Sequence, residues 1–271
     1  MTRKLVAVAG VWVLLTGAGV ALTGAFQRGT PVTKLVPTKA YPHDARAFTQ
    51  GFAWHDGTLY EGTGRNGTSV LRTVDLGTGR TGRIRRLDDR FFGEGVCVLG
   101  DEVFQLTWQS GWAFVYDRDT FTYSRRFRVA GEGWGLTTDG KRLILSDGSS
   151  VLRFLHPKTG EVTGRVRVTD GGRPIAQLNE LEWVPTAADA EDDPGEVLAN
   201  VWYSPRIARI DPGTGRVTGW LDGSDLVRRA GVRDREKVFN GIAHDPKGER
   251  LLLTGKLWPT VFEVPWPKPK K

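Results

Sequence analysis

A short turn sequence built on Asp, Gly and Thr recurs along the chain, each time between two runs of strand-forming residues. The clearest copies occupy residues 74–79, 116–120, 155–160 and 210–215. Such turns between β-rich runs predict β-hairpins. The matching positions Asp75, Asp117, His156 and Asp211 are 42, 39 and 55 residues apart, and a final unit would end near Glu263.

Repeats of roughly 40 to 50 residues with several strands each are typical of β-propeller blades. The chain has room for five such units, so we predict an all-β, five-bladed β-propeller over residues 35–266. A blade buries its faces only against its neighbours, so we expect the ring to close, with strand-forming residues near Leu35 joining the last blade. One strand in each blade, at 58–60, 102–106, 143–145, 197–201 and 251–253, should line or flank the central channel.

The composition fits this architecture and excludes one class of function. The chain has 35 Gly and 10 Trp residues, which suits short strands joined by tight turns. Its net charge is +7, but five positive charges lie in the terminal segments, at Arg3, Lys4, Lys268, Lys270 and Lys271. The remainder lacks the basic stripe of a nucleic-acid-binding protein, so we expect no nucleic-acid partner.

Cysteine and histidine are too sparse to indicate a metal centre. Cys97 is the only cysteine and falls inside an apolar run, where a buried structural thiol is expected. The four histidines are scattered without ligand spacing. We therefore expect no metal and no cofactor.

The N-terminal segment predicts export. Arg3 and Lys4 precede an uncharged apolar run from Leu5 to Phe26, and small residues would allow cleavage after Ala25, as in a signal peptide. The run is also just long enough to span a bilayer, so a membrane anchor stays open. We assign 1–26 to this leader, 27–34 to a linker and 267–271 to a basic tail. The expected product is a secreted or extracytoplasmic monomer that meets the membrane only through an uncleaved leader.

A series of polar and aromatic clusters, spread over the predicted blades, exceeds what turns and core packing demand. In chain order they are Phe48-Thr49-Gln50-Gly51, Phe92-Gly93-Glu94-Gly95, Leu106-Thr107-Trp108-Gln109, Glu132-Gly133-Trp134-Gly135-Leu136, Ser146-Asp147-Gly148, Leu178-Asn179-Glu180-Leu181-Glu182, Ala199-Asn200-Val201-Trp202, Asn240-Gly241-Ile242-Ala243 and Thr254-Gly255-Lys256-Leu257-Trp258. Over about residues 40–263 they resemble, in the same order, the motif series of the glutaminyl-peptide cyclotransferases of the plant and bacterial type. The resemblance implies a five-bladed propeller, in agreement with the repeat count, and an active site at one mouth of its channel.

The resemblance further implies that N-terminal glutamine of peptides or proteins is converted to pyroglutamate with release of ammonia. Nine positions match the pocket of that family: Phe48, Gln50, Phe92, Glu94, Trp108, Trp134, Asn179, Trp202 and Lys256. Glu94 matches the proposed proton-transfer residue. We expect Lys256, Asn179 and Gln50 to supply hydrogen-bond donors to the oxyanion, and the five aromatic residues to form the substrate-binding walls. The acidic loop between Val184 and Val197 departs from the family in length, and its role stays open.

Cyclisation needs no nucleophile from the enzyme, because the substrate's own α-amine attacks its γ-carboxamide carbon. The chain indeed lacks a Gly-x-Ser-x-Gly elbow. Glu94 is predicted to take the proton of the amine and return it to the leaving nitrogen, with a pKa raised by burial. Five further motif residues are interpreted as structural ties between neighbouring blades: Glu132, Asp147, Glu180, Glu182 and Asn240.

Two other functions stay open on the residues alone. A propeller hydrolase of the lactonase type would use Glu, Asn and Asp around the axis to hold a divalent cation, and its activity would depend on that metal. A secreted propeller without catalytic activity would bind peptides or envelope components through its aromatic mouth, since a fold does not by itself fix a function.

Overall fold

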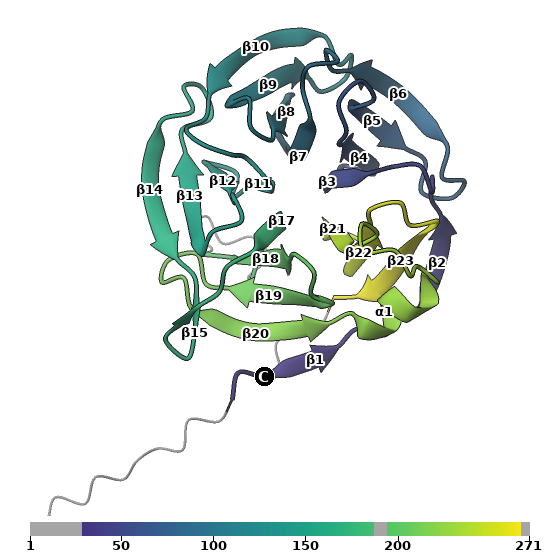
Figure 1. The fold of residues 1–271 in the computed structure, drawn as a ribbon, viewed down its shortest axis with the longest axis vertical. Helices are drawn as coiled ribbons and strands as arrows, with labels where there is room; N and C mark the ends of the chain where they lie inside the picture. The colour runs from purple at the N-terminus through teal and green to yellow at the C-terminus, as the bar shows by residue number, and fades with distance from the viewer. Residues whose placement is uncertain (1–28, 187–193, 267–271) are drawn as a thin grey trace, which may run out of the picture.

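The computed structural model describes residues 29–186 and 194–266, which form five small antiparallel sheets arranged in a ring around a central axis (Figure 1). The first blade contains β3 (Thr49–His55), β4 (Thr58–Thr63), β5 (Val70–Val74) and β6 (Thr81–Arg86). The second contains β7 (Gly93–Leu99), β8 (Glu102–Thr107), β9 (Trp112–Asp117) and β10 (Tyr123–Arg128). The third contains β11 (Leu136–Thr138), β12 (Leu143–Leu145), β13 (Val151–Leu155) and β14 (Val162–Arg167). The prediction of a five-bladed β-propeller is confirmed.

The last two blades also take strands from the start of the chain. The fourth contains β17 (Leu178–Val184), β18 (Glu196–Val201), β19 (Arg206–Ile210) and β20 (Val217–Asp222), with β1 (Val32–Lys34) added in parallel to β20. The fifth contains β21 (Phe239–Asp245), β22 (Arg250–Gly255) and β23 (Thr260–Pro265), and its outer strand is β2 (Lys39–Pro42). A two-stranded ribbon, β15 (Thr169–Asp170) and β16 (Arg173–Pro174), and helix α1 (Ser224–Arg229) lie outside the blades.

The N-terminal strands close the ring differently from the sequence expectation. The fifth blade is completed by β2, which pairs with β23. The prediction that the ring closes in the last blade is therefore correct, but Leu35 does not belong to the strand that closes it. Leu35 is instead buried with the apolar residues between the fourth and fifth blades. Residues 32–34, which we assigned to a linker, form β1. Three exposed residues carry no alternating apolar pattern, so nothing in the sequence signals this strand.

Burial falls from the inner to the outer strand of a blade. Every residue of β21 is buried, whereas every residue of β6 is exposed. The strands predicted to line or flank the channel, such as β4 and β8, lie second from the axis and flank the innermost strands. The predicted turns join the third and fourth strands, where Asp75 and Asp117 each accept a backbone hydrogen bond at 2.8 Å from the threonine three residues later. The sequence pattern therefore located the outer hairpins of the first four blades.

Apolar side chains fill the spaces between neighbouring blades in a closed series of clusters. One cluster joins the first and second blades, the next three continue around the ring, and the cluster containing Phe52 and Ala243 joins the first blade to the fifth. Cys97 is buried in the cluster between the second and third blades, as predicted. Each blade is thus held by both neighbours, which fixes the inner strands that carry the site.

Two carboxylates of β17 tie inner strands together across the axis. Glu180 accepts hydrogen bonds from the backbone N–H of Phe52 and of Ile242, at 3.2 and 2.9 Å. Glu182 accepts one from the backbone N–H of His244 at 2.7 Å. Their interpretation as structural residues is confirmed by these contacts.

No helix among residues 29–186 and 194–266 is long and apolar enough to cross a membrane. The predicted leader, the first part of the linker, most of the acidic loop and the basic tail lie outside the described residues.

Candidate active site

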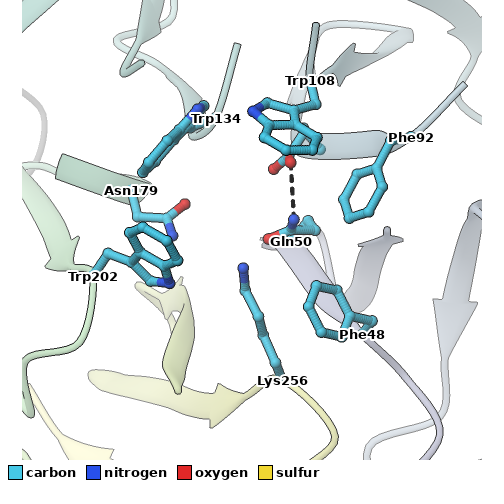
Figure 2. Close-up of a pocket in the computed structure, with 9 residues that line it drawn as sticks. Phe48, Gln50, Phe92, Trp108, Trp134, Asn179, Trp202 and Lys256 are labelled. Atoms are coloured by element: carbon cyan, nitrogen blue, oxygen red, sulfur yellow. Dashed lines mark hydrogen bonds between the residues drawn. The ribbon is translucent and has the colours of Figure 1, made fainter. Parts of the chain in front are cut away.

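A cavity of about 180 Å³ lies where residues from the inner strands of the five blades converge (Figure 2). The residues that line it come either just before or within an innermost strand, or just after a second strand. Because these two strands are antiparallel, the start of one and the end of the other meet at the same edge of each blade. The cavity is lined by Phe48, Gln50, Phe92, Glu94, Trp108, Trp134, Asn179, Trp202 and Lys256. All nine positions predicted for the pocket therefore lie around a single cavity.

Glu94 is the acid of this cavity. It lies on β7, and its side chain is buried, with Oε1 accepting a hydrogen bond from Gln50 Nε2 at 2.8 Å. Desolvation raises the pKa of Glu94 well above its usual value; the positive charge of Lys256 opposes this rise and the negative charge of Glu132 adds to it. A carboxyl whose pKa is raised in this way holds a proton more strongly than usual, which suits a group that must both accept and return one.

Lys256 is the buried cation of the cavity. Its Nζ lies 4.9 Å from the centroid of the Phe48 ring and points into the cavity. Desolvation lowers the pKa of Lys256, while the charges of Glu94 and Glu236 oppose that effect. Among the described residues no carboxylate lies within ion-pair distance of Nζ, so this ammonium group is available to a ligand.

Two further amides face the cavity. The side chain of Asn179 is buried and makes no side-chain hydrogen bond within residues 29–186 and 194–266, and Figure 2 shows it between Trp134 and Trp202. Gln50 donates to Glu94, and its Oε1 is buried without a hydrogen-bond partner among the described residues. A buried acceptor with no partner costs stability unless a ligand satisfies it. Asn179 and Lys256 thus offer donors. Gln50, which was expected to be a third oxyanion donor, instead donates an N–H to Glu94 and offers its oxygen as an acceptor.

Aromatic rings form two walls on opposite sides of these polar groups (Figure 2). On one side Trp134 and Trp202 meet edge to face, with ring centroids 5.5 Å apart. On the other side Phe92 contacts both Phe48 and Trp108, at centroid distances of 6.1 and 5.6 Å. Such walls exclude water and fix the conformation of a small ligand between them.

Glu132 holds two of these rings in place, a role that the sequence analysis missed. Its Oε2 accepts hydrogen bonds from the indole N–H of Trp108 and of Trp134, both at 2.8 Å, and Oε1 accepts one from Gln109 at 3.1 Å. These hydrogen bonds lower the pKa of Glu132, and the one from Trp134 has the largest effect. Because Trp108 follows β8 of the second blade and Trp134 precedes β11 of the third, Glu132 is also the predicted tie between neighbouring blades. Its place two residues before Trp134 was the available signal for the further role.

Two glycines let Trp134 reach its position. A Cβ at Gly135 would lie 1.9 Å from the backbone oxygen of Asn179, so only glycine permits these two inner strands to approach. Gly148 has a φ of +79°, and a Cβ there would lie 2.6 Å from the Trp134 ring. Gly135 of the Gly-Trp-Gly motif and Gly148 of the Ser-Asp-Gly motif are therefore required by packing around the site.

The other motif residues lie outside the cavity. Asn240 donates a side-chain hydrogen bond to the backbone oxygen of Thr49 at 3.0 Å, which ties the fifth blade to the first as predicted. Asp147 lies 3.4 Å from Arg153, which in turn donates to the backbone oxygen of Glu132. Within residues 29–186 and 194–266, no group of three or more His, Cys, Asp or Glu is arranged to hold a metal ion.

Comparison with known proteins points to one family. A family model described as glutamine cyclotransferase matches residues 10–266. A glutaminyl-peptide cyclotransferase of Arabidopsis thaliana is 42% identical over 230 residues, which cover 83% of this chain and 68% of that protein. The crystal structure of Myxococcus xanthus glutaminyl cyclase superposes with a TM-score of 0.79 at 37% identity, covering 87% of this chain and 97% of that one.

Proposed function

Because the chain belongs to the glutamine cyclotransferase family, we propose that its cavity converts the N-terminal glutamine of peptides and proteins to pyroglutamate, releasing ammonia without a metal ion. The observation that carries the proposal is the buried Glu94 carboxyl, which lies in one cavity with the Lys256 ammonium and the Asn179 amide. The reaction needs those three groups and no enzymic nucleophile.

The size of the cavity selects one residue of the substrate. A volume of about 180 Å³ between aromatic walls suits a single glutamine, with the rest of the peptide outside the mouth. Confinement between Trp134, Trp202 and Phe92 would hold the side chain folded back, so that the α-amine lies against the γ-carboxamide carbon. Selecting that conformer supplies much of the rate acceleration, since both reacting groups belong to one molecule.

The first step forms the carbon–nitrogen bond of the ring. The neutral α-amine attacks the γ-carboxamide carbon, and the carbonyl π electrons move to oxygen, which becomes negatively charged. Lys256 and Asn179 donate hydrogen bonds to this oxygen, and donors held ready in a cavity of low polarity stabilise such a charge strongly. The Gln50 oxygen, which has no hydrogen-bond partner among the described residues, would accept an N–H of the attacking amine.

The second step expels ammonia. Glu94, as carboxylate, accepts the proton of the attacking nitrogen and delivers it to the carboxamide nitrogen. The bond between carbon and that nitrogen then breaks as the carbonyl re-forms, and ammonia leaves. Burial raises the pKa of Glu94 in the direction of that of the amine, which is about 7.7–8.0 in free peptides. The smaller difference between the two pKa values helps Glu94 both to accept the proton and to return it.

Incubation of the purified full-length chain with a short peptide that begins with glutamine tests the proposal. Mass spectrometry should show the loss of one ammonia from the peptide, and the rate should be unchanged by a chelator such as EDTA. A matched peptide that begins with asparagine should stay intact, because its shorter side chain would have to close a strained four-membered ring. Failure to cyclise the glutamine peptide would refute the proposed activity, and loss of activity on chelation would refute its metal independence.

We further propose that residues 1–26 direct the chain out of the cytoplasm, as a secreted protein or one anchored through an uncleaved leader. The basis is the basic pair Arg3 and Lys4 followed by an uncharged apolar run. N-terminal sequencing of the protein recovered from each cellular fraction tests this. A mature chain that begins near residue 26 supports cleavage, an intact chain in the membrane fraction supports the anchor, and an intact chain in the cytoplasm contradicts export.

A further inference from the structure

We propose that His43, which lies outside the cavity, is a positioning residue for the cyclisation: as a doubly protonated imidazolium it fixes the turn that carries Lys256. The inference rests on the proposed function, because it concerns the donor that Lys256 provides there. His43 follows β2 at the junction where the N-terminal strand closes the ring.

Both ring nitrogens of His43 face acceptors. Nδ1 lies 2.8 Å from the backbone oxygen of Trp258, and Nε2 lies 3.1 Å from Oε1 of Glu61. A carbonyl and a carboxylate can only accept hydrogen bonds, so satisfying both requires a proton on each nitrogen. The side chain is buried, and water cannot take the place of either partner.

The charged groups around His43 favour this imidazolium. Glu61 is fully buried and also accepts hydrogen bonds from Thr49 and from Arg72, at 2.6 and 2.8 Å. Arg72 in turn pairs with Asp44, so that two carboxylates balance the two cations His43 and Arg72. The remaining neighbours from other strands are neutral: the Phe52 ring meets His43 edge on, and Thr254 Oγ1 lies 3.5 Å from Nδ1.

The turn that His43 binds is strained. Leu257, between Lys256 and Trp258, has a φ of +59°, a conformation that is unfavourable for a residue with a side chain of this size and persists only where its surroundings impose it. The surroundings here are the segment after β2. The Leu257 N–H donates to the backbone oxygen of Ala47 at 2.7 Å, and the next carbonyl accepts from His43. The same segment continues into Phe48 and Gln50, so one support positions residues on two sides of the cavity.

Loss of one proton from His43 would remove this support. Whichever nitrogen kept its proton, the other would turn a lone pair toward the Trp258 carbonyl or toward Glu61. Burial lowers the pKa of His43, but the charge and hydrogen bond of Glu61, with the Trp258 carbonyl, outweigh it and leave the pKa raised above 6.5. The support is therefore complete below about pH 6.5, the unfolded-state value, and is lost as the pH rises through the pKa of the folded state.

The wild-type protein allows a direct test, because the chain has only four histidines. In protein labelled with ¹⁵N-histidine, the signal that disappears in His43→Gln identifies His43. Both of its ring nitrogens should carry protons at about pH 6.5, and protection of the Leu257 amide against hydrogen exchange, corrected for base catalysis, should fall as that signal titrates at higher pH. A neutral His43 at that pH, or protection that does not follow its titration, would overturn the proposal.

Kinetics of His43→Gln supply the second test, with His156→Gln on an exposed outer turn as the matched control. We expect kcat to fall at least about tenfold, because small displacements of a catalytic group have large effects on rate, with KM changed less than about threefold. The control should match wild type. A smaller fall in kcat would contradict a positioning role. So would a fall in kcat/KM that arises mainly from an increase in KM. The resonance and exchange measurements need no turnover, so they judge this inference even if the proposed activity fails.

Discussion

Gln50 on β3 donates a hydrogen bond from Nε2 to Oε1 of Glu94 on β7, over 2.8 Å and across the boundary between the first two blades. Both side chains are buried. The bond engages one of the two carboxylate oxygens of Glu94. Because a donated hydrogen bond favours the charged form of a carboxyl, Gln50 also limits how far burial raises the pKa of Glu94.

Replacing Gln50 by leucine should therefore slow the reaction and shift its pH dependence. A hydrogen bond to a charged group contributes about 1.5–3 kcal/mol, so kcat should fall roughly 10- to 100-fold. The limb of the pH–rate profile that reports ionisation of Glu94 should move to higher pH, since the carboxylate loses its donor. The measurement is kcat across the pH range with a glutamine peptide. A slower enzyme with an unmoved profile would mean that Gln50 does not act through Glu94.

Lys256→Met keeps the length of the side chain and removes its charge. Loss of one oxyanion donor costs about 10²–10³ in kcat. The pKa of Glu94 should rise further, because the charge of Lys256 opposes the effect of burial. Thermal unfolding of the variant should stay close to that of wild type, since a buried ammonium with no ion pair among the described residues adds little stability. A kcat within threefold of wild type would exclude Lys256 as an oxyanion donor.

Glu132→Ala should loosen the aromatic walls. Trp108 and Trp134 would lose their shared acceptor, and two net hydrogen bonds of about 1 kcal/mol each correspond to roughly tenfold or more in kcat/KM. Glu132→Gln is the matched control, because its amide oxygen can still accept from both indoles. Steady-state kinetics of the two variants should differ accordingly. Equal losses would point to the charge of Glu132, rather than its hydrogen bonds, as the important property.

Glu182 makes the stability of the propeller depend on pH. Desolvation raises the pKa of Glu182 to about 8. The hydrogen bonds that Glu182 accepts oppose this rise, and the one from the His244 backbone has the largest effect. Between its unfolded value of about 4.3 and 8, the folded state binds the proton more strongly, so stability falls as pH rises through that window. Glu182→Gln removes this titration. Its melting temperature relative to wild type should increase from about pH 5 to about pH 8, and a difference that is constant over this range would contradict the account.

The sequence predicted the blades because each outer hairpin repeats the same turn chemistry, as at Asp75 and Asp117. It predicted the membership of the cavity through the motif series, since residues at equivalent ends of the inner strands converge at one mouth. The chemical roles of those residues stay predictions.

Contacts between segments far apart in the chain could not be predicted from the sequence. The parallel pairing of β1 with β20 joins Val32 to Trp220, and no local pattern in three exposed residues encodes it. The support of Leu257 by Ala47 and the shared acceptor of Trp108 and Trp134 are likewise set by how the blades pack. A sequence read position by position shows propensities, whereas these features depend on tertiary geometry.

Substitution of Glu94 by glutamine tests the central claim most directly, because it keeps the shape of the side chain and the contact with Gln50 but removes the exchangeable proton. Ammonia release from a glutamine peptide should be measured for wild type and Glu94→Gln, each with and without EDTA, beside Glu161→Gln as an exposed control. We expect kcat to fall about 10²–10⁴-fold in Glu94→Gln alone, and EDTA to change the rate of neither wild type nor control. Cyclisation that persists at the wild-type rate in Glu94→Gln would contradict the central claim.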